Sequence, residues 1–132
     1  MNLTPTEHQE SVKLAQYLSW LEKDKQNAVK FSKLTQETFT RSIKQKSKNK
    51  QEGLRQGVPD YLITINEHCI FIELKRKKGG RLSEHQKEWI EAINKTGAVA
   101  TVCYGSDEAI DFLNIVLKGE VEIDKAKKPH TS

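Results

Sequence analysis

The chain has 132 residues, of which 36% are hydrophobic and 30% are charged, and its formal net charge is +4. One compact domain is expected at this length, and the longest nearly apolar stretch, residues 98–104, is far below the ~20 residues of a membrane-spanning helix. The N-terminus has no leader pattern and the two cysteines form no C-x-x-C pair, so the sequence predicts a cytoplasmic protein without a zinc site.

The first predicted helix begins near Thr4. Thr4, Pro5 and Glu7 match a capping box with proline at the first helical position, and leucines at helical spacing continue the pattern to about Glu22. On a helical wheel, Glu7 and Glu10 fall close to the direction of these leucines. We therefore expect two carboxylates at the N-terminal end of the buried helix face.

The remaining elements alternate between strand and helix patterns. Strands are predicted at residues 29–34, 59–65, 69–76 and 98–104, the last covered on both faces, and helices at 83–96 and 106–118. Ser83 with Gln86, and Ser106, are the expected caps of these two helices. The segment before residue 56 fits either a loop or a short helix ended by Gly53.

Positive charge is concentrated in two segments of the chain. Residues 35–58 hold six basic and two acidic residues, 6 − 2 = +4, and residues 75–81 hold five basic residues and no acid. Two basic segments on an otherwise balanced chain indicate a polyanionic partner such as DNA. Solvated lysine-rich surface is the alternative interpretation.

Three charged residues on neighbouring strands predict a catalytic site. A hairpin turn at residues 66–68 would set Asp60 near Lys75, with Glu73 on the same face as Lys75. Two carboxylates buried on one sheet face need a compensating ion, and their oxygens suit Mg²⁺. A metal held in this way activates water and polarises phosphate, which points to phosphodiester hydrolysis, although an exposed cross-strand ion pair is the simpler alternative.

The segments GVPDYLI (57–63) and IFIELKRKKGGRLSEHQKEWI (70–90) resemble the VRR-NUC (virus-type replication-repair nuclease) family of the PD-(D/E)XK nuclease superfamily. The resemblance covers about residues 4–118. It implies an α/β fold with a restriction-endonuclease-like αβββαβ core, a mixed sheet flanked by helices, and one extra C-terminal helix. We expect a nuclease domain over residues 1–119 and a polar, basic tail over residues 120–132.

The resemblance also implies roles for individual residues. Asp60, Glu73 and the Leu74 carbonyl would hold the metal, and Lys75 would act on the attacking water. Gln86 matches a helix glutamine that assists the active site, although the capping box over Ser83 is an equally concrete role. The helix acid is expected to be Glu7, which also fits the predicted cap, with Glu10 as the substitute.

The basic residues expected to contact DNA phosphates are Arg41, Lys44, Arg55, Lys77, Lys78 and Arg81. Similar phage proteins often carry a Pro-Asn-Gly loop before an arginine, where this chain has residues 37–41, ETFTR. No histidine pair has metal-ligand spacing. Trp20, Trp89 and Tyr104 fit core or interface positions better than base-stacking positions.

The function implied by the resemblance is a Mg²⁺- or Mn²⁺-dependent DNA endonuclease that acts as a homodimer on branched DNA such as Holliday junctions. Small members of this kind are commonly phage-encoded, which implies the cytoplasm of a bacterial host. A non-catalytic nucleic-acid-binding module on the same fold is the main alternative. A sequence-specific restriction-type enzyme is a third possibility, although a chain this short leaves little room for a recognition domain.

Overall fold

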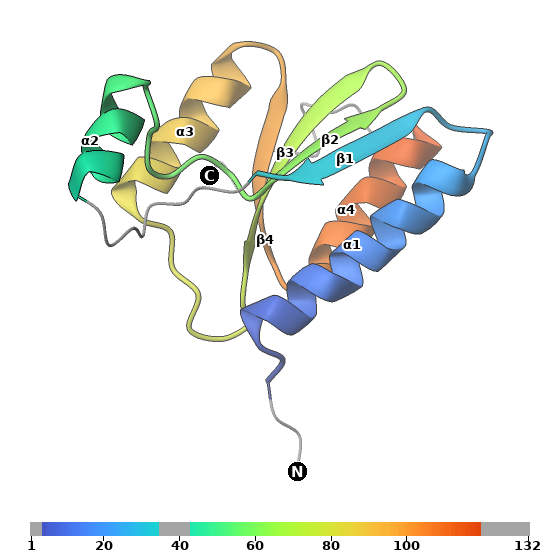
Figure 1. Ribbon diagram of the computed structural model, residues 1–132. Helices are drawn as coiled ribbons and strands as arrows, with labels where there is room; N and C mark the ends of the chain where they lie inside the picture. Colours follow the sequence, from blue (N-terminus) through green and yellow to red (C-terminus); the bar gives the residue numbers. More distant parts are fainter. Residues whose placement is uncertain (1–3, 35–42, 120–132) are drawn as a thin grey trace.

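The computed structural model describes residues 4–34 and 43–119. Its elements, in chain order and as labelled in Figure 1, are α1 (Glu7–Lys23), β1 (Val29–Lys33), α2 (Ile43–Gln51), β2 (Tyr61–Ile65), β3 (His68–Lys75), α3 (Glu84–Lys95), β4 (Val99–Tyr104) and α4 (Ser106–Lys118). Within these ranges no helix is long and apolar enough to cross a membrane. The predicted tail at 120–132 and the loop at 37–41 lie outside the described residues.

The four strands form one mixed sheet in the order β1-β2-β3-β4. Strand β2 is antiparallel to both β1 and β3, whereas β4 is parallel to β3. The parallel pair is possible because helix α3 returns the chain to the end of the sheet at which β3 begins. Helices α1 and α4 pack together on one face, whereas α3 contacts β4 from the other side (Figure 1). The predicted α/β architecture is confirmed.

The hydrophobic core lies between the sheet and the α1–α4 pair. Alternation along β2 and β3 sends Ile63, Ile70 and Ile72 to this face, where they pack with Leu14 and Leu18 of α1, and all five side chains are fully buried. Strand β4 is buried along nearly its whole length, as its continuous apolar pattern predicts. Trp20 is not a core residue, because 64% of it is exposed on α1.

Two predicted helix caps are wrong. The capping box of α1 is formed by Thr6 and Gln9, not by Thr4 and Glu7. The threonine two residues later has the same cap chemistry, so the sequence alone did not fix the helix start. Helix α4 has Gly105 at its N-cap, and the Ser106 hydroxyl is directed elsewhere.

The hairpin turn is shorter than predicted. Tyr61 pairs with Ile72 and Ile65 pairs with His68, so the loop contains only residues 66 and 67. Asn66 accepts the left-handed conformation that this tight turn requires, with φ of 54°. The register is shifted by two residues, and its continuation sets residue 60 opposite residue 73 instead of 75.

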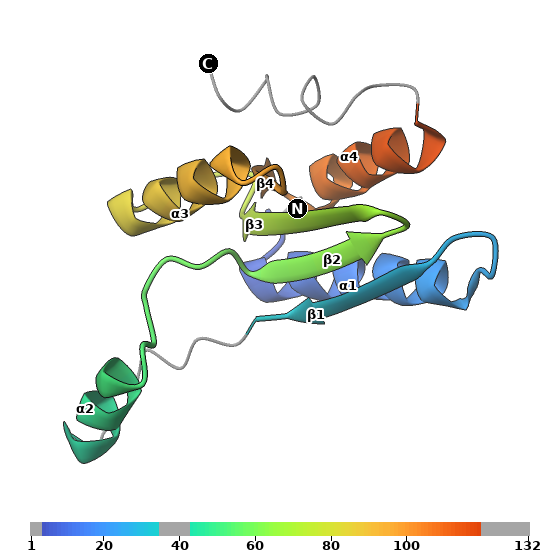
Figure 2. The same ribbon diagram turned by 90° about the horizontal axis from the view of Figure 1, so that it is seen from above.

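Helix α2 stands apart from the sheet. It occurs in the long connection between β1 and β2, and the two views show it on the side of the molecule that carries α3 (Figures 1 and 2). The short-helix alternative for the basic segment is therefore confirmed. Residues 52–60 then lead from α2 into β2.

Gly57 is a position in this connection where a side chain has no room. Its φ is +89°, and a Cβ atom there would lie 2.6 Å from the backbone carbon of His85. Gly53 has a similar φ of +94° but open space around it. Because both alanines carry backbone strain but only one overlaps α3, Gly57→Ala is expected to cost about 3 kcal/mol of unfolding free energy and Gly53→Ala about 1 kcal/mol.

Urea unfolding of the two alanine variants checks this difference. Equal losses of stability would show that the 52–60 connection can move away from α3 at little cost.

Candidate active site

The hairpin brings three of the predicted catalytic residues together. Asp60 immediately precedes β2, and its Oδ2 accepts a hydrogen bond of 2.9 Å from the backbone N–H of Leu74 on β3. The Asp60 carboxyl is near enough to Glu73 to raise the pKa of Glu73. The ammonium of Lys75 lies 3.7 Å from Glu73 Oε2. The predicted convergence of two carboxylates and a lysine is therefore present, despite the shifted register.

Glu73 is in an unfavourable environment for a carboxylate. It is 2% exposed, and its Oε1 is buried without a hydrogen-bond partner among the described residues. Burial raises the pKa of Glu73 to about 9, and the neighbouring Asp60 and Glu7 add to this rise while Lys75 opposes it. One lysine does not compensate the two adjacent acids, so the metal-free site holds a proton that a bound cation could replace.

The donor set fits a divalent cation that keeps part of its water shell. Two adjacent carboxylates with an unpartnered oxygen are the hard oxygen ligands that Mg²⁺ or Mn²⁺ binds. No group of three His, Cys, Asp or Glu side chains within residues 4–34 and 43–119 is arranged to hold a metal. The protein ligands available at this point are thus Asp60, Glu73 and backbone oxygen, with water for the rest.

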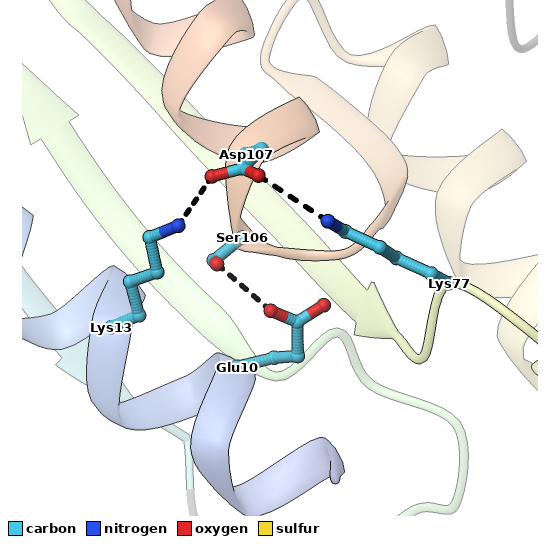
Figure 3. A network of polar contacts seen from close by, with 5 residues as sticks. All are labelled: Glu10, Lys13, Lys77, Ser106 and Asp107. Carbon is cyan, nitrogen blue, oxygen red and sulfur yellow. Dashed lines mark hydrogen bonds and ion pairs between the residues drawn. The ribbon is translucent and has the colours of Figure 1, made fainter. Parts of the chain in front are cut away.

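The two candidate acids of α1 occupy different environments. Glu7, the first residue of the helix, is exposed and not on the buried face as predicted, but its charge acts on Glu73. Glu10 is 3% exposed, and its Oε1 accepts a hydrogen bond of 2.9 Å from the Ser106 hydroxyl (Figure 3). This contact ties Glu10 to the start of α4, whereas the charge of Glu7 is the one that acts on Glu73.

The contact between Glu10 and Ser106 belongs to a larger polar network. Asp107 forms ion pairs with Lys13 of α1 and with Lys77, which follows β3 (Figure 3). Hydrogen bonds from these two lysines lower the pKa of Asp107. Lys77 was predicted to contact DNA, but the structure pairs its ammonium with a carboxylate.

The roles of Ser106 and Asp107 in this network were not predicted from the sequence. Helical spacing places Glu10 one turn before Leu14, which indicates its burial. However, no pattern in the sequence predicts that Glu10 bonds to Ser106, which lies 96 residues away along the chain.

Ser106→Ala is expected to destabilise the protein by about 1–3 kcal/mol, because it leaves both oxygens of a buried carboxylate without a hydrogen bond. Glu10 Oε2 already has no partner among the described residues. The exposed Ser32→Ala is the matched control and should change stability by less than about 0.5 kcal/mol. Thermal unfolding of both variants measures the difference, and a neutral Ser106→Ala would contradict the importance of this contact.

Gln86 has the structural role that the sequence offered as the alternative. Its Oε1 accepts a hydrogen bond of 2.8 Å from the backbone N–H of Ser83, and its own N–H donates to the Ser83 hydroxyl. In the described structure, no hydrogen bond joins it to Asp60, Glu73 or Lys75.

The other predicted DNA-contacting residues are dispersed. Lys78 and Arg81 are exposed between β3 and α3, and Arg55 lies in the connection after α2. Arg41 and the side chain of Lys44 lie outside the described part of the molecule.

Comparisons with known proteins show the family and the fold of this chain. The VRR-NUC domain family matches residues 3–107, which contain α1, the Asp60–Glu73–Lys75 site and the start of α4. A solved "VRR_NUC domain protein" has a TM-score of 0.65 and 21% sequence identity, over 88% of this chain and 91% of that one, and thus shares the fold. No curated protein matches the sequence. Because the family match spans most of the chain, this protein belongs to the VRR-NUC family of nuclease-type domains.

Proposed function

We propose that this protein is an endonuclease that hydrolyses phosphodiester bonds of DNA with the help of Mg²⁺ or Mn²⁺. The observation that carries the proposal is the buried Glu73, with one unpartnered carboxylate oxygen, next to the half-buried Asp60 and the ammonium of Lys75. A purely structural ion pair does not require two adjacent acids on one lysine. Membership in a nuclease-type family supports the same activity.

Each residue of the site has a chemical task in this proposal. A bound divalent cation supplies Lewis acidity and lowers the pKa of a bound water. Asp60 and Glu73 hold the cation, and the Leu74 N–H fixes the orientation of Asp60 through its 2.9 Å hydrogen bond. Lys75, whose side chain is 16% exposed, can reach both Glu73 and solvent. It is therefore suited to orient the attacking water and to stabilise negative charge on the phosphate.

The preferred substrate in the proposal is branched DNA, and the active form is a homodimer in the cytoplasm of a bacterial host. A four-way junction is resolved by cutting two strands, whereas each chain contributes one Asp60–Glu73–Lys75 site. A dimer would supply both sites at once. Sedimentation at micromolar protein concentration tests this assembly. A free protein with the mass of one chain, which also binds junction DNA as a single chain, would contradict it.

Cleavage of a labelled four-way junction with Mg²⁺ or Mn²⁺ tests the proposed activity. The parent protein is expected to cut, whereas Lys75→Ala and Asp60→Asn should lose about a hundredfold or more in rate. Asp111→Asn, at an exposed position of α4, is the matched control and should cut normally. Flaps, nicked duplex and linear duplex in the same assay define the preferred geometry.

The alternative function has its own signature in this experiment. A parent protein that retards the junction in a gel but never cuts it would be a nucleic-acid-binding module on a nuclease fold.

A further inference from the structure

A groove of about 880 Å³ lies between α2 and the first turns of α3. Its walls come from α2, from the connection that follows it and from α3, so it is lined by segments far apart in the sequence. Figures 1 and 2 show these two helices on the same side of the molecule. Asp60, Glu73 and Lys75 are not among its lining residues, so the groove is a feature separate from the proposed catalytic site.

The charge of the groove favours a polyanion. Lys46 and Lys50, one helical turn apart on α2, line it together with Arg55. Its acidic lining residue, Glu88, lies 3.9 Å from the imidazole of His85. Three permanent cations against one carboxylate make a site suited to the phosphates of a nucleic-acid strand.

The groove also contains an aromatic ring held at a fixed position. The indole N–H of Trp89 donates a hydrogen bond of 3.1 Å to the carbonyl of Gln56, which anchors the ring in the wall. Leu54 also lines the groove and is 39% exposed. Unpaired bases bind to an aromatic side chain set among cations, whereas the bases of a duplex are already stacked on each other.

The connection after α2 joins this groove to the proposed active site. Arg55 and Gln56 line the groove, Gly57 packs against His85 at the start of α3, and Asp60 follows three residues later. The wall of the groove therefore continues along the chain to one of the acids proposed to hold the metal.

We propose that the α2–α3 groove binds a short unpaired segment of the DNA strand adjacent to the scissile phosphate. Lys46, Lys50 and Arg55 contact its phosphates, and Trp89 contacts a base. The choice of DNA as the ligand rests on the proposed function, whereas the preference for an unpaired strand comes from the groove itself.

Tryptophan fluorescence provides a direct test, because the chain has only two tryptophans. In a Trp20→Phe background, Trp89 alone reports binding, and the replaced residue is an exposed side chain on α1. The test is to measure the fluorescence of this variant while adding an oligothymidylate of about eight nucleotides or, separately, a duplex of the same length. Divalent cations are left out of both titrations. The single strand should quench Trp89 at concentrations at which the duplex does not.

Paired charge variants locate the binding. Lys46→Gln with Lys50→Gln should weaken oligothymidylate binding about tenfold and lower the slope of log K against log salt by about 1.4, which corresponds to two lost phosphate contacts. Lys48→Gln with Lys118→Gln removes the same charge from positions outside the groove and should leave both quantities near the parent values. Absence of quenching, equal quenching by the duplex, or equal losses in both double variants would overturn the assignment.

This experiment is independent of cleavage because no metal is present. If the parent cuts DNA but Trp89 does not respond to the single strand, the groove assignment is wrong and the nuclease proposal stands. If the groove variants lose binding while the parent never cuts with Mg²⁺ or Mn²⁺, the groove assignment stands and the nuclease proposal is wrong.

Discussion

Glu73→Gln is expected to abolish cleavage and, in the same protein, to stabilise the metal-free fold at pH 8. The variant removes one of the two carboxylates proposed to hold the cation, so the cleavage rate should fall by about a thousandfold or more. It also replaces a buried acid that has an unpartnered oxygen by a neutral side chain of the same shape. The gain in unfolding free energy should be at least about 1 kcal/mol.

Glu67→Gln is the matched control, because Glu67 is exposed in the hairpin turn that joins the same two strands. It should leave both the cleavage rate and the stability near the parent values. Urea unfolding in a chelator and a cleavage assay on the same preparations give the two readings. Loss of both activity and stability in Glu73→Gln would mean that Glu73 is a structural residue, not a metal ligand.

The unfolding free energy of the metal-free protein is expected to fall as the pH rises from about 4.5 to about 9. The pKa of Glu73 is about 9 in the folded protein, against an ordinary value of 4.5. Between these values the folded state holds a proton that the unfolded state has lost, so deprotonation favours unfolding. For one such proton the slope reaches about 1.4 kcal/mol per pH unit, and it vanishes below the lower pKa and above the higher one.

The groups that face Glu73 decide how a cation changes this behaviour. Asp60 and Glu7 oppose its ionisation and Lys75 favours it. Mg²⁺ or Mn²⁺ is expected to stabilise the fold more at pH 8 than at pH 5, because only the ionised carboxylates bind the metal strongly.

Denaturant unfolding over this pH range, with a chelator or with added cation, measures both effects. Glu73→Gln should lose most of the pH dependence and most of the response to metal. A flat stability profile in the parent protein would contradict the proposed environment of the buried Glu73.

Local patterns predicted most of the elements because their signals are short-range. The alternation of apolar residues in β3 and the serine–glutamine capping box of α3 each involve residues only a few positions apart in the sequence, and both are confirmed. The start of α1 was misassigned because Thr4 and Thr6 offer the same cap chemistry within one turn. The hairpin register was wrong by two residues because Asn66 accepts positive φ, which allows a tighter turn.

Contacts between distant segments had no comparable signal. Asp107 pairs with Lys13 and Lys77, and nothing in their sequence neighbourhoods specifies these partners. Trp89 was expected in a core or interface position, whereas the structure places it in the wall of a basic groove. The burial of Glu10 could be predicted from its helix face, but its bond to Ser106 depends on how α1 and α4 pack together.

The sequence by itself determined the element types, the family and the three charged residues of the site, because these depend on residue type and on spacing along one or two adjacent strands. Only the tertiary structure decided that Glu10 is bonded to Ser106, that Lys77 is paired with Asp107, and that α2 and α3 enclose a groove. Each of these depends on the relative placement of separately formed elements. That placement is set by packing of the whole core, which no local pattern encodes.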